Sequence, residues 1–217
     1  MAEARYRGEV VKLDRGYPLV RLEDGELLRC EHATALVKGE RRRAVIGDVV
    51  EVAVPPAHDK GVIEAIAPRA REFVRKDPTE RAVPQVLAAN FERVIVAQPV
   101  GEVNLRRLER ELVLAFETGA EVTVVLTKAD LADDAATRAT VEAVRALAAP
   151  AADVLVVSED DPASVEDVRA LLAPGTTTVL IGRSGVGKSS LVNMLVGAEV
   201  LSVGAVREGG GKGRHTT

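Results

Sequence analysis

Residues 182–189 are the stretch of this sequence whose types and spacing point most directly to a chemistry. They read Gly-Arg-Ser-Gly-Val-Gly-Lys-Ser and fit G-x-x-x-x-G-K-[ST], a pattern that binds nucleoside triphosphates. The glycines let backbone N–H groups turn toward phosphate oxygens. Lys188 can reach the β- and γ-phosphates, and the Ser189 hydroxyl is a ligand for Mg²⁺. The sequence therefore predicts a phosphate site at Gly182, Arg183, Ser184, Gly185, Val186, Gly187, Lys188, Ser189 and Ser190.

The residues on either side of this loop predict the elements that such a site needs. Residues 177–181 are an apolar run typical of a buried β-strand, and residues 190–195 indicate a helix. The N-terminal end of that helix would point its partial positive charge at the same anion. A glycine-rich turn with a chance lysine is the alternative interpretation, and the strand–loop–helix context argues against it.

A second candidate site is Thr127-Lys128-Ala129-Asp130, which resembles the [NT]-K-x-D motif by which GTPases recognise guanine. An ionised Asp130 accepts two hydrogen bonds, from guanine N1–H and the exocyclic amine, and adenine does not offer this pair. The methylene stem of Lys128 would lie along the base. Ser158 fits a second base-contacting loop, usually S-A-x, although Glu159 stands in place of the alanine. The alternatives are a helix cap after a strand for Asp130 and a turn residue for Ser158.

These motifs lie in a region where predicted strands and helices alternate, which predicts a parallel sheet with helices on both faces. Leucines at helical spacing indicate a helix over 104–117. A second helix lies within 132–152, capped by Asp133 or Asp134, and a third begins at Asp161-Pro162. The predicted strands cover residues 94–97, 121–126, 153–157 and 177–181.

The first 67 residues have a different pattern, with short alternating segments separated by turn residues. We expect five strands, and the number favours a small closed barrel, an OB-fold, with an SH3-like barrel as the alternative. The longest connection carries basic residues that could contact RNA phosphates or could simply be solvated. With few aromatic residues, base stacking cannot dominate such contacts. The strands are expected at 6–13, 19–22, 27–31, 48–54 and 61–66, and the RNA-binding candidates are Lys38, Arg41, Arg42 and Arg43.

Three prolines and several arginines mark residues 68–88. We expect this segment to be a linker, and a second RNA-contacting patch is the alternative. The predicted domains are therefore an OB-fold barrel at 1–67, a linker at 68–88 and a nucleotide-binding domain at 89–217.

The order of the motifs is informative, because the base motifs precede the phosphate loop, whereas in ordinary GTPases they follow it. A circularly permuted GTPase domain behind a small β-barrel resembles the bacterial ribosome small-subunit-dependent GTPases. Further similarities lie at residues 8–11, 47–50, 88–91, 104–110 and 211–217. The resemblance implies a GTP-binding and GTP-hydrolysing assembly factor that uses Mg²⁺ and docks on the small ribosomal subunit and its rRNA.

The same resemblance assigns residues 211–217 to a switch segment, in which Thr216 or Thr217 ligates Mg²⁺. His215, beside these threonines, is a candidate catalytic residue, because an imidazole can orient a water near neutral pH. A surface histidine without a catalytic role is the alternative.

The sequence also departs from the family. It stops at Thr217, before the family's D-x-x-G motif and zinc-binding segment, so we expect nucleotide binding to survive better than hydrolysis. One cysteine and three scattered histidines cannot form the family's zinc site. Two other classes stay open: a GTP-dependent binding module whose hydrolysis is incidental or lost, and an ATP-using kinase, against which Asp130 argues.

Composition limits the remaining possibilities. The 217 residues are 47% hydrophobic and 29% charged, typical of a globular protein, and the net charge of −4 argues against a general nucleic-acid coat. Cys30 is the only cysteine, which fits a reducing compartment. The sequence has no apolar run of about 18 residues and no signal peptide at its start. We expect a cytoplasmic monomer with no membrane contact.

Overall fold

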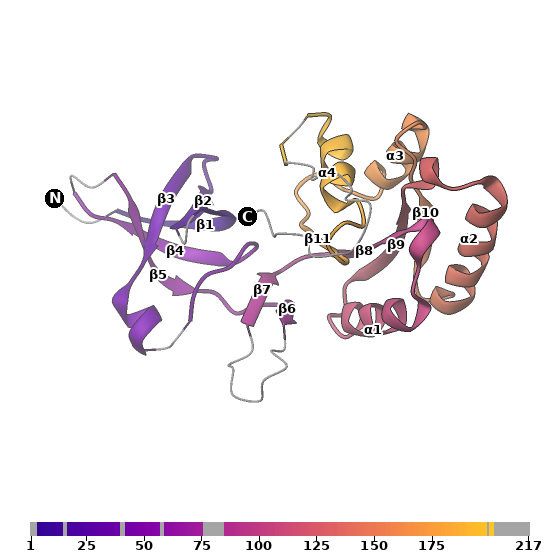
Figure 1. Ribbon diagram of the computed structural model, residues 1–217. Helices are drawn as coiled ribbons and strands as arrows, with labels where there is room; N and C mark the ends of the chain where they lie inside the picture. The colour runs from indigo at the N-terminus through magenta and orange to yellow at the C-terminus, as the bar shows by residue number, and fades with distance from the viewer. Residues whose placement is uncertain are drawn as a thin grey trace. The chain divides into compact units, whose positions relative to one another are not determined.

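The computed structural model describes residues 4–14, 17–39, 42–56, 59–75, 85–198 and 200–201. The chain divides into two compact units, Met1–Phe91 and Glu92–Thr217. The first unit is built mainly from strands, and the second combines strands with helices (Figure 1).

The first unit contains a closed five-stranded barrel. Its strands are joined in the order β1-β2-β3-β5-β4, and β4 pairs back onto β1. All pairs are antiparallel except β3–β5, and a short π-helical turn η1 (Ala35–Gly39) follows β3. This arrangement confirms the OB-fold prediction over the SH3-like alternative. The strands are β1 (Ala4–Asp14), β2 (Tyr17–Leu22), β3 (Leu27–His32), β4 (Val49–Val54) and β5 (Gly61–Ile66).

Alternating side chains of these strands point into the barrel, as the period of a strand requires. Val10, Val20 and Ile63 have no exposed surface, and Leu36 from η1 packs into the same core cluster. Gly8 faces β2 so closely that a Cβ there would lie 2.6 Å from the Arg21 carbonyl oxygen. The small glycine therefore lets two strands approach in the wall of the barrel.

The segment after the barrel forms a second β-pair rather than a plain linker. Strand β6 (Glu72–Arg75) pairs antiparallel with β7 (Gln85–Ala89), and the chain divides after Phe91, so this pair belongs to the first unit. The composition of residues 68–88 predicts a linker, because prolines and arginines are typical of connections.

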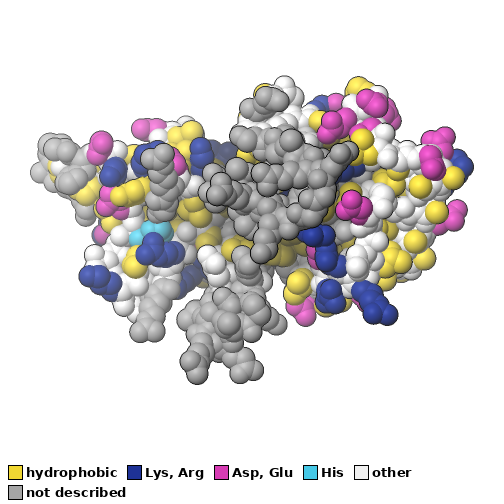
Figure 2. Space-filling view, in the orientation of Figure 1, with side chains coloured by type: hydrophobic (Ala, Val, Ile, Leu, Met, Phe, Trp, Pro, Cys, Tyr) yellow, Lys and Arg dark blue, Asp and Glu magenta, His cyan; other side chains and the backbone are white. Residues whose placement is uncertain are grey.

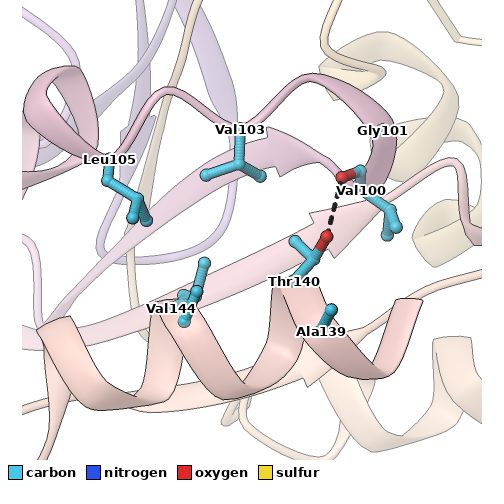
Figure 3. Close-up of a pocket in the computed structure, with 8 residues that line it drawn as sticks. Val100, Gly101, Val103, Leu105, Ala139, Thr140 and Val144 are labelled. Atoms are coloured by element: carbon cyan, nitrogen blue, oxygen red, sulfur yellow. Dashed lines mark hydrogen bonds between the residues drawn. The ribbon is translucent and has the colours of Figure 1, made fainter. Parts of the chain in front are cut away.

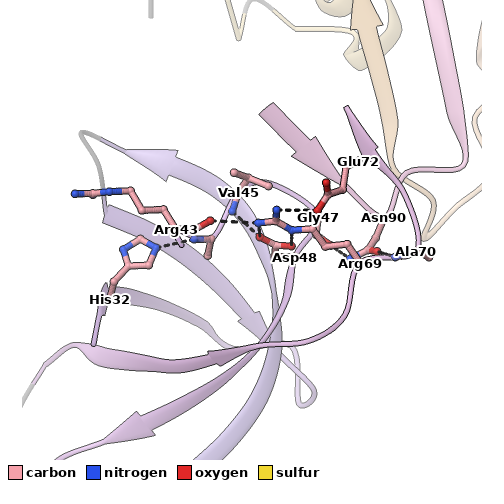
Figure 4. A network of polar contacts seen from close by, with 10 residues as sticks. His32, Arg43, Val45, Gly47, Asp48, Arg69, Ala70, Glu72 and Asn90 are labelled. Atoms are coloured by element: carbon pink, nitrogen blue, oxygen red, sulfur yellow. Dashed lines mark hydrogen bonds and ion pairs between the residues drawn. The ribbon is translucent and has the colours of Figure 1, made fainter. Parts of the chain in front are cut away.

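A buried ion pair attaches this segment to the barrel (Figure 4). Arg69 donates from Nε to Asp48 Oδ1 over 2.7 Å and from Nη2 to Asp48 Oδ2 over 2.8 Å. The Asp48 side chain is completely buried and that of Arg69 is 8% exposed. Asp48 also accepts the Val45 N–H over 2.8 Å. Arg69 is therefore committed to the fold, and the alternative that this segment's arginines form an RNA patch does not hold for it.

Asn90 and Gly47 make a second attachment in the same region. Asn90 has a positive φ of 52°, donates to the Gly47 carbonyl over 2.9 Å and accepts the Ala70 N–H over 2.8 Å. Gly47 has a φ of +87°, and a Cβ there would lie 1.9 Å from the Ala89 carbonyl oxygen. Only glycine fits at this position, because both the backbone conformation and the space exclude a side chain.

The second unit contains a parallel sheet in the order β10-β9-β8-β11. Helices α1 and α2 lie on one side of this sheet, and α3 and α4 lie on the other (Figure 1). The predicted parallel sheet with helices on both faces is therefore confirmed. Its elements are β8 (Arg93–Pro99), η2 (Val100–Glu102), α1 (Leu105–Phe116), β9 (Glu121–Thr127), η3 (Ala129–Leu131), α2 (Asp134–Ala148), β10 (Asp153–Val156), α3 (Pro162–Arg169), β11 (Thr178–Ile181) and α4 (Lys188–Val196).

Side-chain caps begin three of these helices. Asn104, Asp133 and Asp161 accept backbone N–H groups at the starts of α1, α2 and α3. Of the two candidates for α2, the cap is therefore Asp133. In the described part of the chain, no helix is long and apolar enough to cross a membrane.

His32 makes a hydrogen bond that requires its neutral form. Its Nε2 accepts the Ala44 N–H over 2.9 Å, so this nitrogen carries no proton (Figure 4). Burial lowers the pKa of His32 below its ordinary value of 6.5, and the nearby Arg43 charge lowers it further.

We expect acid to destabilise the barrel through His32, because a protonated Nε2 cannot accept the Ala44 N–H. The folded pKa is below the unfolded one, so this contribution is complete above about pH 6.5 and is lost as the pH falls below it. His32→Gln supplies an acceptor that does not titrate. Between about pH 7.5 and about pH 5.5 it should lose less unfolding free energy than the parent, by about 1 kcal/mol or less for this partly exposed group.

Urea denaturation followed by tyrosine fluorescence measures this difference, because both tyrosines, Tyr6 and Tyr17, lie in the first unit. Identical pH dependence in parent and variant would contradict the assignment.

Candidate functional site

The four parallel strands of the second unit end at one edge of the sheet, which is where open α/β sheets bind ligands. The segments that leave this edge after β9, β10 and β11 carry the predicted base and phosphate motifs. The fold therefore places the motifs, which are far apart in the sequence, at the same edge of one sheet.

The phosphate motif forms a tight turn between β11 and α4. Gly182, Gly185 and Gly187 have φ values of +142°, +85° and +96°, which residues with a side chain rarely adopt. A Cβ on Gly182 would lie 2.5 Å from the Ala97 carbonyl oxygen of β8. Gly187 begins α4 without any side-chain cap, so the first N–H groups of this helix remain available to an anion.

Lys188 is the first residue of α4 and folds back over the loop. Its Nζ donates to the Gly182 carbonyl over 2.8 Å and to the Arg183 carbonyl over 2.9 Å. Burial lowers the pKa of Lys188, and the Glu111 charge opposes this shift. Ser189 and Ser190 follow in the first turn of α4 and are half-buried. A bound phosphate group would therefore meet backbone N–H groups of the glycine-rich loop, the Lys188 ammonium and the Ser189 hydroxyl.

Thr127 joins the two motifs. It ends β9, its side chain is buried, and its hydroxyl donates to the Val186 carbonyl in the phosphate loop. The same hydroxyl lies 3.2 Å from the Gln98 carbonyl oxygen at the end of β8. A Cβ on Gly187 would lie 3.3 Å from the Thr127 side chain. The sequence predicts Thr127 as a nucleotide-binding residue. In the structure its hydroxyl links the end of β9 to the phosphate loop by a hydrogen bond.

Lys128 and Asp130 follow Thr127, and Asp130 lies on the short helix η3. Lys128 has a positive φ of 58° and precedes η3. Asp130 Oδ1 accepts the Glu159 backbone N–H over 3.3 Å, so the two predicted base-contacting loops touch. Ser158 lies in the second of these loops, and its hydroxyl accepts the Asp160 N–H over 3.3 Å. The structure therefore brings together the base candidates Lys128, Asp130 and Ser158 and the loop that carries Lys188.

The remaining predicted residues are placed elsewhere or fall outside the described ranges. Arg41, His215, Thr216 and Thr217 lie outside the residues that the structure describes. Lys38 lies in the last turn of the short helix η1, and Arg42 and Arg43 follow in the connection to β4. These three belong to the barrel unit.

A cavity of about 280 Å³, lined by none of the motif residues, lies between η2, the start of α1 and α2 (Figure 3). Thr140 Oγ1 donates to the Val100 carbonyl over 3.1 Å at its wall. Among the described residues that line it none carries a charge, so they offer nothing that would hold phosphate. Its lining residues are Val100, Gly101, Val103, Leu105, Ala139, Thr140, Ala143 and Val144.

Two residues outside the predicted motifs, Gln98 and Glu111, form a hydrogen-bonded pair next to the end of β8 that contacts Gly182. The buried Gln98 donates from Nε2 to Glu111 Oε2 over 2.5 Å. Burial raises the pKa of Glu111 above its ordinary value. The charges of Arg107, Lys188 and Arg110 and the hydrogen bond from Gln98 oppose this shift only in part. Neither residue belongs to a motif, so the sequence carried no signal for them.

The chain is similar to known proteins in both sequence and structure. The model of the family described as RsgA GTPase matches residues 66–217. A "Small ribosomal subunit biogenesis GTPase RsgA" from Streptomyces avermitilis is 42% identical over all 217 residues, which cover 58% of that relative. A relative of the same name from Xanthomonas campestris is 40% identical over 176 residues, covering 81% of this chain and 46% of its own. The chain thus spans about half the length of these curated relatives.

Solved structures agree with this fold. The crystal structure of YjeQ from Thermotoga maritima matches 88% of this chain and 65% of its own with a TM-score of 0.71 and 27% identity. YloQ, whose structure is described as a circularly permuted GTPase, matches 88% of this chain and 64% of its own with a TM-score of 0.65 and 24% identity. The predicted fold, a small barrel with a permuted phosphate-loop sheet, is confirmed.

We expect Thr127→Val to destabilise the second unit, because the change keeps the shape but leaves the Val186 carbonyl without its donor. The loss of such a buried hydrogen bond costs about 1–3 kcal/mol. Urea denaturation followed by circular dichroism measures the change. Thr178→Val in β11 is a matched control, because the Thr178 hydroxyl makes no side-chain hydrogen bond to the residues that the structure describes. Equal stability of both variants would show that the Thr127 hydrogen bond to Val186 does not stabilise the second unit.

Proposed function

We propose a function from the premise that this chain belongs to the RsgA GTPase family: it binds GTP with Mg²⁺, hydrolyses it, and acts in assembly of the small ribosomal subunit. The observation that carries the nucleotide part is the Thr127 hydroxyl bond to the phosphate loop. This bond brings the T-K-x-D motif into contact with the G-x-x-x-x-G-K-S motif. A single nucleotide that bound to both motifs would require them to be this close.

The phosphates would occupy the loop 182–188. There the uncapped start of α4 and the Lys188 ammonium supply positive charge, and the three glycines with positive φ keep the backbone accessible. Lys188 would exchange its bonds to the Gly182 and Arg183 carbonyls for bonds to phosphate oxygens. The phosphates carry full negative charge, so this exchange gives stronger hydrogen bonds.

The base would lie at the Asp130 side of the site. Asp130 and the Glu159 N–H already meet there, so a guanine can find an acceptor for its N1–H and amine next to a donor for its O6. Lys128 and Ser158 lie in the same two loops and are proposed as base-side contacts.

Mg²⁺ fits a site that begins with Ser189, because a hydroxyl oxygen beside phosphate oxygens is a ligand type that this ion prefers. The switch threonine, Thr216 or Thr217, is proposed as its second protein ligand. His215 is proposed to assist hydrolysis by orienting water. When bound, the ion would neutralise charge on the phosphates.

Docking on the small subunit and its rRNA is proposed for the barrel unit. The relatives' names refer to biogenesis of that subunit, and OB-folds bind nucleic acids. Lys38, Arg41, Arg42 and Arg43 are the proposed phosphate contacts. We further propose that the protein acts as a cytoplasmic monomer.

Replacing Asp130 by Asn tests the nucleotide assignment. The variant keeps the shape but presents an amide donor where guanine also presents donors, so GTP should lose roughly 2–4 kcal/mol of binding free energy. Xanthine has a carbonyl in place of guanine's amine, so the variant should prefer xanthosine triphosphate to GTP. Competition calorimetry with GTP, ATP and xanthosine triphosphate measures the preference.

Asp133→Asn serves as the matched control, because asparagine also caps a helix and Asp133 only caps α2. It should bind nucleotides like the parent. Retained preference for GTP in Asp130→Asn would refute guanine recognition by this residue.

Charge reversal of Arg42 and Arg43 to glutamate tests the docking proposal. We expect weaker binding to small subunits and a salt dependence flattened by about one unit for each lost phosphate contact, with GTP affinity unchanged. Co-sedimentation over a salt series measures this. Arg145→Glu, an exposed reversal on α2, is the control. Equal loss of binding in both variants would show only a nonspecific charge effect.

A further inference from the structure

The carboxyl group of Glu111, on α1, is hydrogen-bonded to the residue next to the strand end that contacts the phosphate loop. Its Oε2 accepts a hydrogen bond of 2.5 Å from the Gln98 side chain, and Gln98 is 4% exposed. The carbonyl oxygen of Ala97, one residue before Gln98, is the atom that a Cβ on Gly182 would meet at 2.5 Å. The end of β8 therefore contacts the start of the phosphate loop and also holds Glu111.

The charge of Glu111 interacts with that of Lys188 in the phosphate loop. Lys188 and Glu111 each shift the pKa of the other, in the directions expected for opposite charges that are near one another. Lys188 donates to the Gly182 and Arg183 carbonyls and makes no hydrogen bond to Glu111, so the two side chains interact through their charges alone. Glu111 also lies on α1 among the basic residues Arg107 and Arg110, and Figure 2 shows Lys and Arg side chains gathered over α1.

We propose that Glu111 is a positioning residue that supplies the counter-charge of Lys188 in the nucleotide-free site and opposes the entry of phosphate charge. This inference rests on the proposed function, since it concerns the same phosphate site. Gln98 keeps the carboxylate in place, so the repulsion is built into the folded protein and does not depend on a mobile surface side chain.

Glu111 should therefore make the free energy of nucleotide binding less favourable, and the effect should grow with the negative charge of the nucleotide. A carboxylate held near the loop attracts Lys188 in the empty site and repels each negative charge brought to the lysine. A half-buried charge is screened by salt less than an exposed one. Glu111 therefore weakens GTP binding more than GDP binding and lowers the ratio of GTP affinity to GDP affinity.

The experiment compares parent, Glu111→Gln and Glu111→Asp by calorimetry with GTP, GDP and GMP at about pH 8, where a carboxyl is ionised. Glutamine keeps the length and can still accept the Gln98 N–H, while aspartate keeps the charge. We expect Glu111→Gln to bind GTP about three- to tenfold more tightly, GDP with a smaller gain and GMP with the smallest. Glu111→Asp should stay near the parent in its ratio of GTP to GDP affinity.

Glu109→Gln is the control for charge on the same helix, because Glu109 is exposed and should leave all three affinities unchanged. If Glu111→Gln leaves the GTP-to-GDP ratio of the parent unchanged, or weakens all nucleotides equally, Glu111 has only a structural role and the inference is overturned. If the parent itself binds no GTP, the proposed function fails and this inference fails with it.

Discussion

One hydroxyl group holds the two halves of the candidate site together. Strand β9, which carries the base motif, and strand β11, which carries the phosphate loop, are not neighbours, because β8 lies between them. Thr127 spans this gap, with its hydroxyl against the Gln98 carbonyl of β8 and donating to the Val186 carbonyl beyond β11. Because Thr127 is buried, water cannot replace the bond.

This geometry explains why the order of the motifs along the chain can be permuted. Strands of a parallel sheet are joined by right-handed crossovers, and these connections run over the faces of the sheet, away from the edge where ligands bind. The base loops and the phosphate loop are placed by the sheet order β10-β9-β8-β11 and not by which strand comes first. Thr127 and Val186 can therefore meet although the base motif precedes the phosphate loop in the sequence.

Local patterns predicted the elements well, and long-range pairing was harder to foresee. Caps such as Asp161 before Pro162 and the strand before Gly182 are visible in a few consecutive residues. The β6–β7 pair and the burial of Arg69 against Asp48 depend on residues distant in sequence, and an arginine in a proline-rich stretch has the composition of a linker. Glu111 could not be singled out for a similar reason, because it stands among several charged residues of α1.

Lys188 and Asp130 both make hydrogen bonds to backbone atoms, and these bonds determine where binding energy can come from. Lys188 donates to two loop carbonyls, and Asp130 accepts one amide at 3.3 Å. Only the difference between these bonds and those to a nucleotide contributes to affinity. That difference is large where a phosphate replaces a neutral carbonyl and where two guanine donors replace one long bond. Specificity for guanine should therefore arise at Asp130, and the strength of binding at Lys188, where Glu111 also acts.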